Sequence, residues 1–565
     1  MKFLFSIYIL LSSAFDLTSQ QIILDESFDD WESQAYSYFD KDGDGNSKGI
    51  DITNVGISND ENYLFIYFDL NTEINIQQNN NLSIFIDTDN NVSTGISRYG
   101  IGADLEYYLG SRNGRYYKGS SVFQVFHNQL GLVTSPTVTG SKFEICLLRK
   151  FNYSSNQANM SDIIKVVISD EEVAGDRAPD NNGGYSFEFD KSKKFIPKGF
   201  TIKKERADYL RVMSYNVLRD NLFESGLQQN YRRIFKALIP DIIGFCEIYD
   251  NSSDQTAALI ESYLPSTGNQ KWYHAGVSPD IRVVSRYPII NSRSIDGNGA
   301  FLIDLGKSKL VFIVAHLPCC ENENQRQQEV DNIMSFVRGI KFGISSFQVP
   351  QNTPVIIVGD MNLVGYRQQQ QTFLTGNIVN NNTFGPDFDP DWDDSVLEDA
   401  TPHTTNMPVT FTWNSDFGSY SAGRLDYVIY SGSVAESKNS FALWPLTLTN
   451  EQLSASGLQR DDVHIASDHL PVICDFFIPG FSTSTSENSG HFPFEYSIDN
   501  HHLFFQSALS GNIIISDLSG RIIQKFQKSA QNEKIIIDLN EGLSSGIYIL
   551  HFQTENGGYS VKIFR

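Results

Sequence analysis

The sequence is poor in cysteine, and this scarcity limits the chemistry it can carry. Five cysteines are few for a chain of 565 residues, and an odd number cannot pair completely. No spacing among them is typical of a zinc site. Cys246 and Cys474 lie in apolar runs and are expected as buried thiols, whereas the adjacent Cys319 and Cys320 are either free or joined in a strained vicinal disulfide. We therefore do not expect cysteine to be the catalytic residue.

Basic residues are also in deficit. The chain has 43 Lys and Arg against 67 Asp and Glu, which gives a formal charge of −24. This balance argues against a protein that holds long nucleic acid on a broad basic face. It leaves open a site in which a metal ion bridges the protein to a phosphate group.

Long apolar runs are absent except at the N-terminus. Residues 1–20 have one Lys, an apolar core from Phe3 to Leu11, and then small and polar residues. This pattern is typical of a secretory signal peptide with cleavage near residue 20, and it is too short to span a membrane. With no other candidate for a transmembrane helix, we expect a protein that is secreted or held at the outer cell surface.

The remaining chain is too long for one core, so several domains are expected. Short strands separated by Asn, Asp and Gly predict a β-sandwich over residues 21–195. A basic stretch with one proline, residues 196–206, reads as a linker. Strands alternating with helices predict an α/β domain over 207–479. A Ser/Thr/Gly-rich linker at 480–494 precedes short alternating strands that predict a small β-sandwich over 495–565.

Two acidic loops in the first region are candidates for structural calcium. One of them has Asp at positions 1, 3, 5 and 12 and Gly at position 6, which is the oxygen-ligand spacing that Ca²⁺ uses. The other offers two Asp and one Asn within five residues. Both loops could instead be solvated turns. The candidate ligands are Asp40, Asp42, Asp44 and Asp51 in the first loop and Asp87, Asp89 and Asn91 in the second.

The same region resembles carbohydrate-binding-like β-sandwich modules of secreted bacterial enzymes. The stretches FIDTDNNVSTG and IGADLEYYLG carry this resemblance. It implies a glycan or another cell-surface ligand for residues 21–195.

Polar side chains stand at the ends of six predicted strands of the central region. The stretch PVIIVGDMNLVG, from Pro354, is the clearest example, because a buried run of β-branched residues ends in Asp and Asn. Polar groups at the ends of strands in an α/β sheet can converge on one point. The residues at these ends are Asn216, Glu247, His316, Asp360 with Asn362, Asp426, and Asp468 with His469.

These motifs resemble the endonuclease/exonuclease/phosphatase superfamily. The resemblance is carried by SYNV at Ser214, CEI at Cys246, AHLP at Ala315, GDMN at Gly359, GRLDYV at Gly423 and SDHLPV at Ser467. It implies a four-layered α/β sandwich with two packed mixed sheets. It also implies hydrolysis of a phosphate ester with a divalent cation at one edge of the sheets.

The residue types fit this chemistry. Hydrolysis of a phosphate ester needs a cation on the phosphoryl oxygens, a base for water and a donor for the leaving oxygen. We expect Glu247, Asn216 and Asp468 to bind the metal. Oxygen ligands favour Mg²⁺ or Mn²⁺, with Ca²⁺ as a further candidate.

The catalytic residues are expected among the other members of the set. Asp426 should fix the ring of His469, and Asp360 should orient or deprotonate water. Asn362 should donate to a phosphate oxygen, and His316 should stabilise the phosphoryl group or protonate the leaving group. The sequence does not decide which histidine is acid and which is base.

Substrate is the open question. Trp413, in a stretch similar to one of apurinic-type nucleases, could stack on a base or sugar or be a core aromatic, and Arg282 could face the site. We expect a phosphodiesterase, most simply a nuclease acting on DNA or RNA. A phosphatase or sphingomyelinase-like esterase on inositol phosphates or phospholipids is the alternative, and an inactive surface-binding protein is a remote one.

The C-terminal region resembles the sorting domain of the type IX secretion system. SDLSGRII at Ser516, LSSGIYIL at Leu543 and the final SVKIFR carry the resemblance. It implies that the secretion machinery is a partner, and an ordinary accessory β-domain is the alternative.

Overall fold

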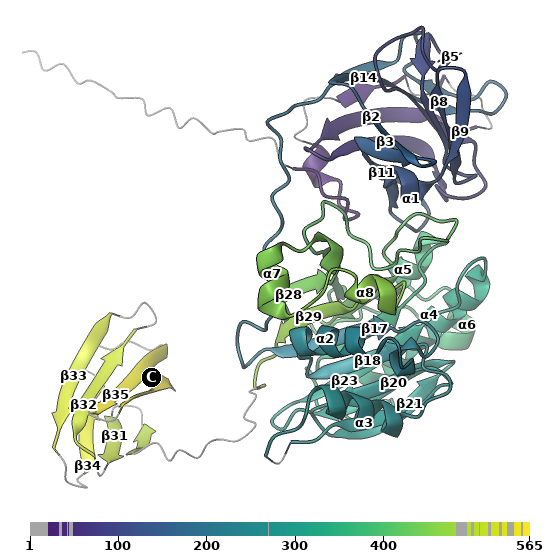
Figure 1. The fold of residues 1–565 in the computed structure, drawn as a ribbon. Helices are drawn as coiled ribbons and strands as arrows, with labels where there is room; N and C mark the ends of the chain where they lie inside the picture. The colour runs from purple at the N-terminus through teal and green to yellow at the C-terminus, as the bar shows by residue number, and fades with distance from the viewer. Residues whose placement is uncertain are drawn as a thin grey trace, which may run out of the picture. The chain divides into compact units, whose positions relative to one another are not determined.

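The computed structural model describes most of the chain beyond the predicted signal peptide. The described residues are 21–32, 37–41, 43–44, 49–268, 270–481, 494–498, 502–507, 509–517, 521–529, 534–539, 547–554 and 557–564. They divide into two compact units, one that ends at Thr483 and one that begins at Ser484 (Figure 1). Residues 1–20 and most of the spacer after residue 481 lie outside the described residues.

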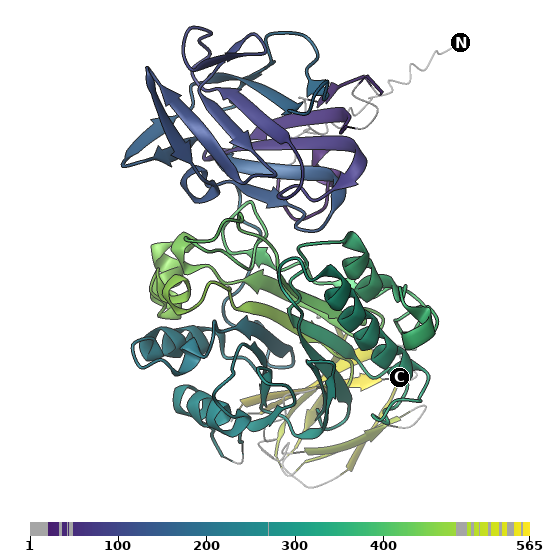
Figure 2. The same ribbon diagram turned by 90° about the vertical axis from the view of Figure 1, so that its right-hand side faces the viewer.

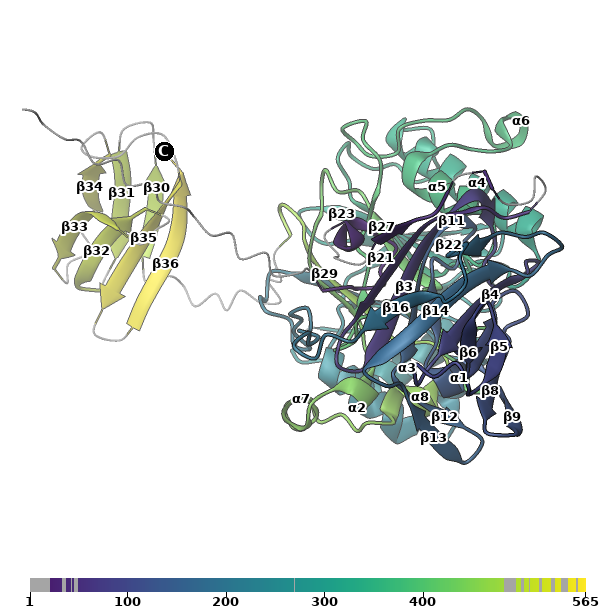
Figure 3. The same cartoon turned by 90° about the horizontal axis from the view of Figure 1, so that it is seen from above.

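The first region is built from two antiparallel sheets, as expected for a β-sandwich (Figure 3). One sheet has the strand order β1-β2-β3-β11-β10, and the other has the order β15-β14-β4-β7-β8-β9 with β16 beside β14. The strands of these two sheets include β1 (Ser37–Phe39), β2 (Ile52–Asn59), β7 (Leu105–Tyr108), β8 (Asn113–Lys118), β9 (Ser121–Val125), β15 (Arg177–Ala178) and β16 (Tyr185–Glu188). Apolar side chains of both sheets share one core. The strands used below are β3 (Tyr63–Ile74), β4 (Leu82–Asp87), β10 (Val133–Ser135), β11 (Gly140–Leu148) and β14 (Ile163–Asp170).

The central region contains two mixed sheets, which fit the predicted α/β sandwich. The first has the order β19-β20-β18-β17-β29-β28-β26 and the second the order β21-β22-β23-β24-β27-β25. The outer strands are β19 (Tyr273–Gly276), β26 (His403–Thr404) and β28 (Glu436–Ala442) in the first sheet, and β21 (Ile289–Ile295), β22 (Asn298–Asp304) and β25 (Glu398–Asp399) in the second. The central strands are β17 (Leu210–Asn216), β18 (Ile242–Cys246), β20 (Arg282–Ser285) and β29 (Val472–Phe477) in the first sheet, and β23 (Lys309–His316), β24 (Val355–Asp360) and β27 (Asp426–Tyr430) in the second.

The two central sheets pack face to face. A Cβ added to Gly244 in β18 would lie 2.7 Å from the side chain of Val314 in β23, so glycine permits a close approach there. Side chains of both sheets belong to one buried apolar cluster. This packing brings the ends of β17 and β18 next to the ends of β23 and β24.

Helices cover the outer faces of these sheets on both sides (Figure 2). The predicted helix before Pro240 is α2 (Gln228–Leu238), whose Ile234, Phe235 and Leu238 are buried. Helix α3 (Ser253–Tyr263) begins at Ser252, whose side chain accepts a hydrogen bond from the Gln255 amide. The predicted second helix is α4 (Glu323–Lys341), which lies over the second sheet beside α5 (Arg367–Thr375).

The sandwich and the central region share part of their core. Trp31, Phe65, Tyr67 and Val133 of the sandwich belong to the same buried cluster as β17 and β18. Two isolated parallel bridges, Leu24 to Val409 and Val133 to Ala422, also join the two regions. The sandwich is therefore packed against the central region within one compact unit.

The C-terminal unit has two small antiparallel sheets, β30-β31-β34 and β33-β32-β35-β36. The strands are β30 (Phe494–Ile498), β31 (His502–Ser507), β32 (Gly511–Ser516), β33 (Ile522–Lys528), β34 (Lys534–Asp538), β35 (Ile547–Thr554) and β36 (Gly557–Phe564). Its core contains Leu503, Phe505, Ile513, Ile515 and Leu550. This arrangement is consistent with the small β-sandwich that the alternating pattern predicts. No helix among the described residues is long and apolar enough to cross a membrane.

Candidate active site

The predicted residues meet at one edge of the two packed sheets. Asn216, His316 and Asp360 are the last residues of β17, β23 and β24, and Glu247 directly follows β18. Asp426 instead begins β27, and Asp468 and His469 precede β29. Because β27 pairs antiparallel with β24 and β29 antiparallel with β17, the starts of these two strands lie at the same edge as the other ends.

Backbone geometry at the strand ends aims these side chains. Gly359, with φ of 135°, has no room for a side chain, since a Cβ there would lie 1.9 Å from the carbonyl oxygen of Ala315. This close approach places Asp360 directly opposite His316 in the parallel register of β23 and β24. Glu247 and Asn362 have φ of 64° and 45°, and such left-handed residues other than glycine cluster at functional sites.

Asn216 joins the two carboxylates of the site. Its Nδ2 donates to Glu247 Oε1 at 2.9 Å and to Asp360 Oδ2 at 3.0 Å, and its Oδ1 accepts from the amide of Leu218. The other oxygen of Glu247 accepts from the amide of Arg219 at 3.0 Å. The amide of Asn216 thus fixes the distance between Glu247 and Asp360.

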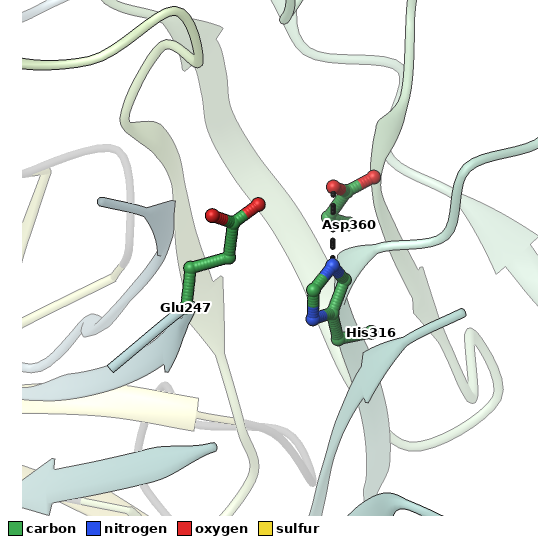
Figure 4. Close-up of side chains that lie close together, drawn as sticks. All are labelled: Glu247, His316 and Asp360. Atoms are coloured by element: carbon green, nitrogen blue, oxygen red, sulfur yellow. Dashed lines mark ion pairs between the residues drawn. The ribbon is translucent and has the colours of Figure 1, made fainter. Parts of the chain in front are cut away.

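His316 stands between two carboxylates. Its Nδ1 is hydrogen-bonded to Asp280. Its Nε2 lies 3.8 Å from Asp360 Oδ2. Figure 4 shows the pair His316 and Asp360 beside Glu247. Burial by itself lowers the pKa of His316, but the hydrogen bond with Asp280 and the charges of Asp360 and Glu247 outweigh it and raise the pKa to about 9. The imidazole is therefore held in its charged form.

His469 has an equivalent arrangement on the other side of Asp360. Its Nδ1 lies 2.8 Å from Asp426 Oδ2, and its Nε2 lies 3.5 Å from Asp360 Oδ2. Burial lowers the pKa of His469, and the charges of Asp426 and Asp360 outweigh this effect and raise it to about 10. Burial also raises the pKa of Asp360, which His469 and His316 oppose.

Glu247, His316 and Asp360 could hold a metal ion. One ligand atom from each lies within 4.8 Å of the others. The carboxylate oxygens of this group are the ligands that Mg²⁺ or Mn²⁺ prefers, whereas His316 could coordinate a cation only with its ring neutral. Asp468 is not a member of this group. Its Oδ2 accepts a hydrogen bond from Trp413 Nε1 at 3.0 Å, and its buried Oδ1 has no hydrogen-bond partner.

The remaining predicted residues have different surroundings. Asn362 Nδ2 donates one hydrogen bond to the carbonyl of Leu317, which leaves its second N–H for a ligand. Trp413 lines the cavity at the site. Arg282 does not line that cavity, and its guanidinium donates to the carbonyls of Asn251, Ser278, Pro279 and Ile281. Arg282 therefore braces the loop that carries Asp280.

The cavity at this edge has a volume of about 640 Å³. Its lining contains Asn362 and His469 together with the three residues of the metal-binding group. Cys319 and Cys320 also line it, and they are free thiols with Sγ atoms 2.6 Å apart. Cys246 and Cys474 are buried thiols, as their apolar surroundings predict.

Sequence reasoning missed Asp280, the partner of His316. Asp280 accepts from His316 and from Ser278, and these hydrogen bonds outweigh burial and lower its pKa. Its only signal is the Ser-Pro-Asp turn before β20, two residues from Arg282. Because turns with Asp are common, the sequence gives no reason to select this one.

The acidic loops of the sandwich form two carboxylate clusters. Asp40 and Asp44 meet Asp176 and Asp180, while Asp51 accepts from the amide of Gly43, and Asp42 lies outside the described residues. In the other loop Asp87 and Asp89 meet Asp104. The side chain of Asn91 instead accepts from the amide of Ser93. Neither Asp104 nor the pair Asp176 and Asp180 was among the expected ligands, because they lie in other loops of the chain.

Two family models match separate parts of this chain. Residues 213–469 match the model of the Endonuclease/Exonuclease/phosphatase family, and residues 497–564 match that of the secretion system C-terminal sorting domain. A search of curated protein sequences finds no match.

Solved structures similar to this chain include a truncated TDP2 from Caenorhabditis elegans. It has 16% identity, the match covers 48% of this chain and 98% of the other, and the TM-score is 0.31. The human Nocturnin catalytic domain has 17% identity, covers 48% of this chain and 95% of its own, and has a TM-score of 0.29. Sphingomyelinase C from Streptomyces griseocarneus has 14% identity, covers 47% and 99%, and has a TM-score of 0.29.

The family models confirm both resemblances that the sequence motifs carry. The sorting domain indicates export to the cell surface or secretion. Over residues 213–469 this chain is similar to the Endonuclease/Exonuclease/phosphatase family, and over residues 497–564 it is similar to the type IX secretion sorting domain.

Proposed function

We propose that this protein is an exported, divalent-metal-dependent hydrolase of phosphodiesters. The observation that carries the proposal is the convergence of Glu247, His316, Asp360 and His469 at one cavity. Phosphoryl transfer to water requires a cation, a base for the water and donors to the phosphoryl and leaving oxygens. The two carboxylates supply the cation's ligand and the base, and the two charged imidazoles supply the donors.

The charge states favour particular roles. His316 and His469 are held protonated, so both act as donors, one to a phosphoryl oxygen and one to the leaving oxygen. Asp360, whose pKa is raised by burial, is the group left to orient and deprotonate water. Asn362 donates its second N–H to a phosphoryl oxygen.

Glu247 would hold the cation, and Asn216, whose Nδ2 donates to both Glu247 and Asp360, keeps this ligand beside the base. A divalent cation bound there supplies positive charge to the phosphoryl oxygens. Asp468 acts by orienting Trp413 at the cavity.

A nuclease acting on DNA or RNA is the first candidate within this class. A phosphatase or sphingomyelinase-like esterase acting on a small organophosphate is the second. The specific observation that favours the second is the acidic lining of the cavity, which has five carboxylates and a single arginine, Arg219.

The test is a hydrolysis assay on bis(p-nitrophenyl) phosphate, plasmid DNA, RNA, sphingomyelin and inositol phosphates. Each substrate is incubated with Mg²⁺, Mn²⁺, Ca²⁺ or chelator. We expect metal-dependent hydrolysis that Glu247→Ala and His469→Ala abolish while the unfolding transition is retained. The conservative surface change Asp389→Asn is the control, since Asp389 is exposed and outside the cavity lining. Full activity of either active-site variant would refute the site.

A further inference from the structure

The cavity at the active site is built by both regions of the first unit. Most of its lining comes from the central region, but four residues come from the N-terminal sandwich. They are Asn75, Gln77 and Gln78, in the loop between β3 and β4, and Thr137, in the loop between β10 and β11. The sandwich therefore forms one wall of the proposed substrate cavity.

The sandwich holds the segment that follows the catalytic strand β24. Thr137 Oγ1 donates to the carbonyl of Leu363 at 2.7 Å, and Asn75 Nδ2 donates to the carbonyl of Val364 at 2.9 Å. The amide of Thr139 donates to the carbonyl of Gly365 at 2.8 Å. Three consecutive carbonyls directly after Asn362 thus depend on sandwich residues.

The sandwich also holds the segment that leads to β27 and Asp426. Gln78 Nε2 donates to the hydroxyl of Tyr420 at 2.7 Å, and the amide of Ser421 donates to Gln77 Oε1 at 2.9 Å. The guanidinium of Arg112 lies 4.2 Å from the centre of the Tyr420 ring, and a cation at this distance is attracted to the ring face. Tyr420 is therefore clamped against the cavity by two sandwich loops.

The charge of the lining limits what the cavity can accept. Its carboxylates are Glu247, Asp280, Glu329, Asp360 and Asp468, and apart from the two catalytic histidines its cationic side chain is Arg219. A strand of nucleic acid needs several cationic contacts to its successive phosphates. The sandwich wall supplies uncharged amides and a hydroxyl instead, next to the aromatic rings of Trp413 and Tyr420.

We propose that the N-terminal sandwich is a specificity-determining wall of the active site, and that it selects phosphodiesters with one compact, uncharged organic group. This inference rests on the proposed hydrolase function. A cavity of about 640 Å³ lies within the range that encloses a small ligand. Amides and aromatic rings recognise a polar ring system such as a nucleoside or sugar through hydrogen bonds and stacking. A continuous nucleic-acid strand has further phosphates, which the acidic lining repels.

The experiment compares two substrates with the same leaving group. One is the p-nitrophenyl ester of thymidine 5′-monophosphate, which carries a nucleoside, and the other is methyl p-nitrophenyl phosphate, which does not. In the full chain, Gln78→Ala should raise KM for the nucleoside ester roughly fivefold, because one hydrogen bond of the wall is lost. The kcat for both esters should remain, because Gln78 touches no catalytic residue. Gln78→Glu, a change of nearly equal size, should raise KM further by adding a negative charge to the wall.

The matched control is Gln124→Ala. Gln124 is an exposed glutamine of strand β9, and it does not line this cavity. An unchanged KM in both Gln78 variants would overturn the inference while leaving the hydrolase function intact. Cleavage of plasmid DNA at least as efficient per phosphodiester as that of the nucleoside ester would overturn it too. A wild-type chain that hydrolyses neither ester with any divalent cation would overturn the proposed function itself.

Discussion

At the residue scale, Asp360 is the centre of the proposed chemistry. One oxygen, Oδ2, lies within 4 Å of His316 Nε2 and His469 Nε2 and accepts from Asn216. Each histidine has its other ring nitrogen on a second carboxylate, Asp280 or Asp426. The two Asp–His pairs therefore present their Nε2 atoms to the same point, and a change in either outer carboxylate should act through its histidine.

Asp280→Asn tests the pair that the sequence did not reveal. Asp280 is a positioning residue for His316, so its loss should remove part of the acid–base contribution of this histidine. We expect kcat to fall roughly 10- to 100-fold. Because the hydrogen bond with Asp280 raises the pKa of His316, the alkaline limb of the pH–rate profile should move to lower pH. Steady-state kinetics from pH 6 to 10 measures both effects, and Asp389→Asn is the control. A fall in kcat without a shift of the pH–rate profile would contradict the role of Asp280 as the residue that positions His316.

His469 makes the stability of the metal-free protein depend on pH. Its pKa is raised from 6.5 to about 10 in the fold, so the protonated ring stabilises the folded state fully below pH 6.5. This stabilisation is lost as the pH rises toward 10. In chelator, the melting temperature should therefore fall across this range, and Asp426→Asn should reduce the fall because a carboxylate that raises the pKa is gone. A melting temperature that rises across the same range would contradict this assignment.

At the element scale, strand ends explain how much of the site the sequence could predict. Apolar runs that stop at Asn216, His316 and Asp360 mark the ends of buried strands, and helical spacing marks α2 and α4. These local signals were sufficient to select most of the side chains that the structure brings together at the candidate site. Asp280 and Asp104 were missed because their partners lie 36 and 16 residues away, and such pairs arise from tertiary packing that no local pattern records.

The sandwich loop between β4 and β5 (Ile96–Arg98) provides a test of the calcium hypothesis. Asp87 is buried and one of its oxygens, Oδ2, has no hydrogen-bond partner, and burial raises the pKa of both Asp87 and Asp104. A cation between these groups and Asp89 would satisfy the buried oxygen. We expect Ca²⁺ at 100 times its Kd to stabilise the protein by about 2.7 kcal/mol, and Asp89→Asn to reduce this gain.

Differential scanning calorimetry with Ca²⁺ or chelator measures this gain. Glu188→Gln is the matched control, because Glu188 is an exposed acid of β16 (Tyr185–Glu188) outside both carboxylate clusters. Equal thermograms with Ca²⁺ and chelator would show that the loops are solvated turns.

At the scale of the whole molecule, the sandwich and the central region cannot be treated as separable modules. Glu26 of the sandwich region and Asp399 of the central region both pair with the buried Arg424, at 2.6 and 2.5 Å. Removing one partner of a buried ion pair leaves an uncompensated charge, which costs about 3–5 kcal/mol. The shared apolar cluster adds to this dependence. The C-terminal sheets, in contrast, form a compact unit of their own.

Truncations at the two ends should therefore have opposite outcomes. A chain of residues 207–481 would expose the surfaces that Leu24, Trp31 and Val133 cover, and each buried apolar side chain contributes about 1.5–3 kcal/mol. We expect this chain to aggregate or to unfold well below the melting temperature of residues 21–481. Residues 21–481, which lack only the sorting domain, should retain the melting temperature of their unit and full hydrolysis of bis(p-nitrophenyl) phosphate. A soluble, cooperatively folded and fully active chain of residues 207–481 would contradict the shared core, because the catalytic edge would then form without the sandwich loops that hold residues 363–365 and Tyr420.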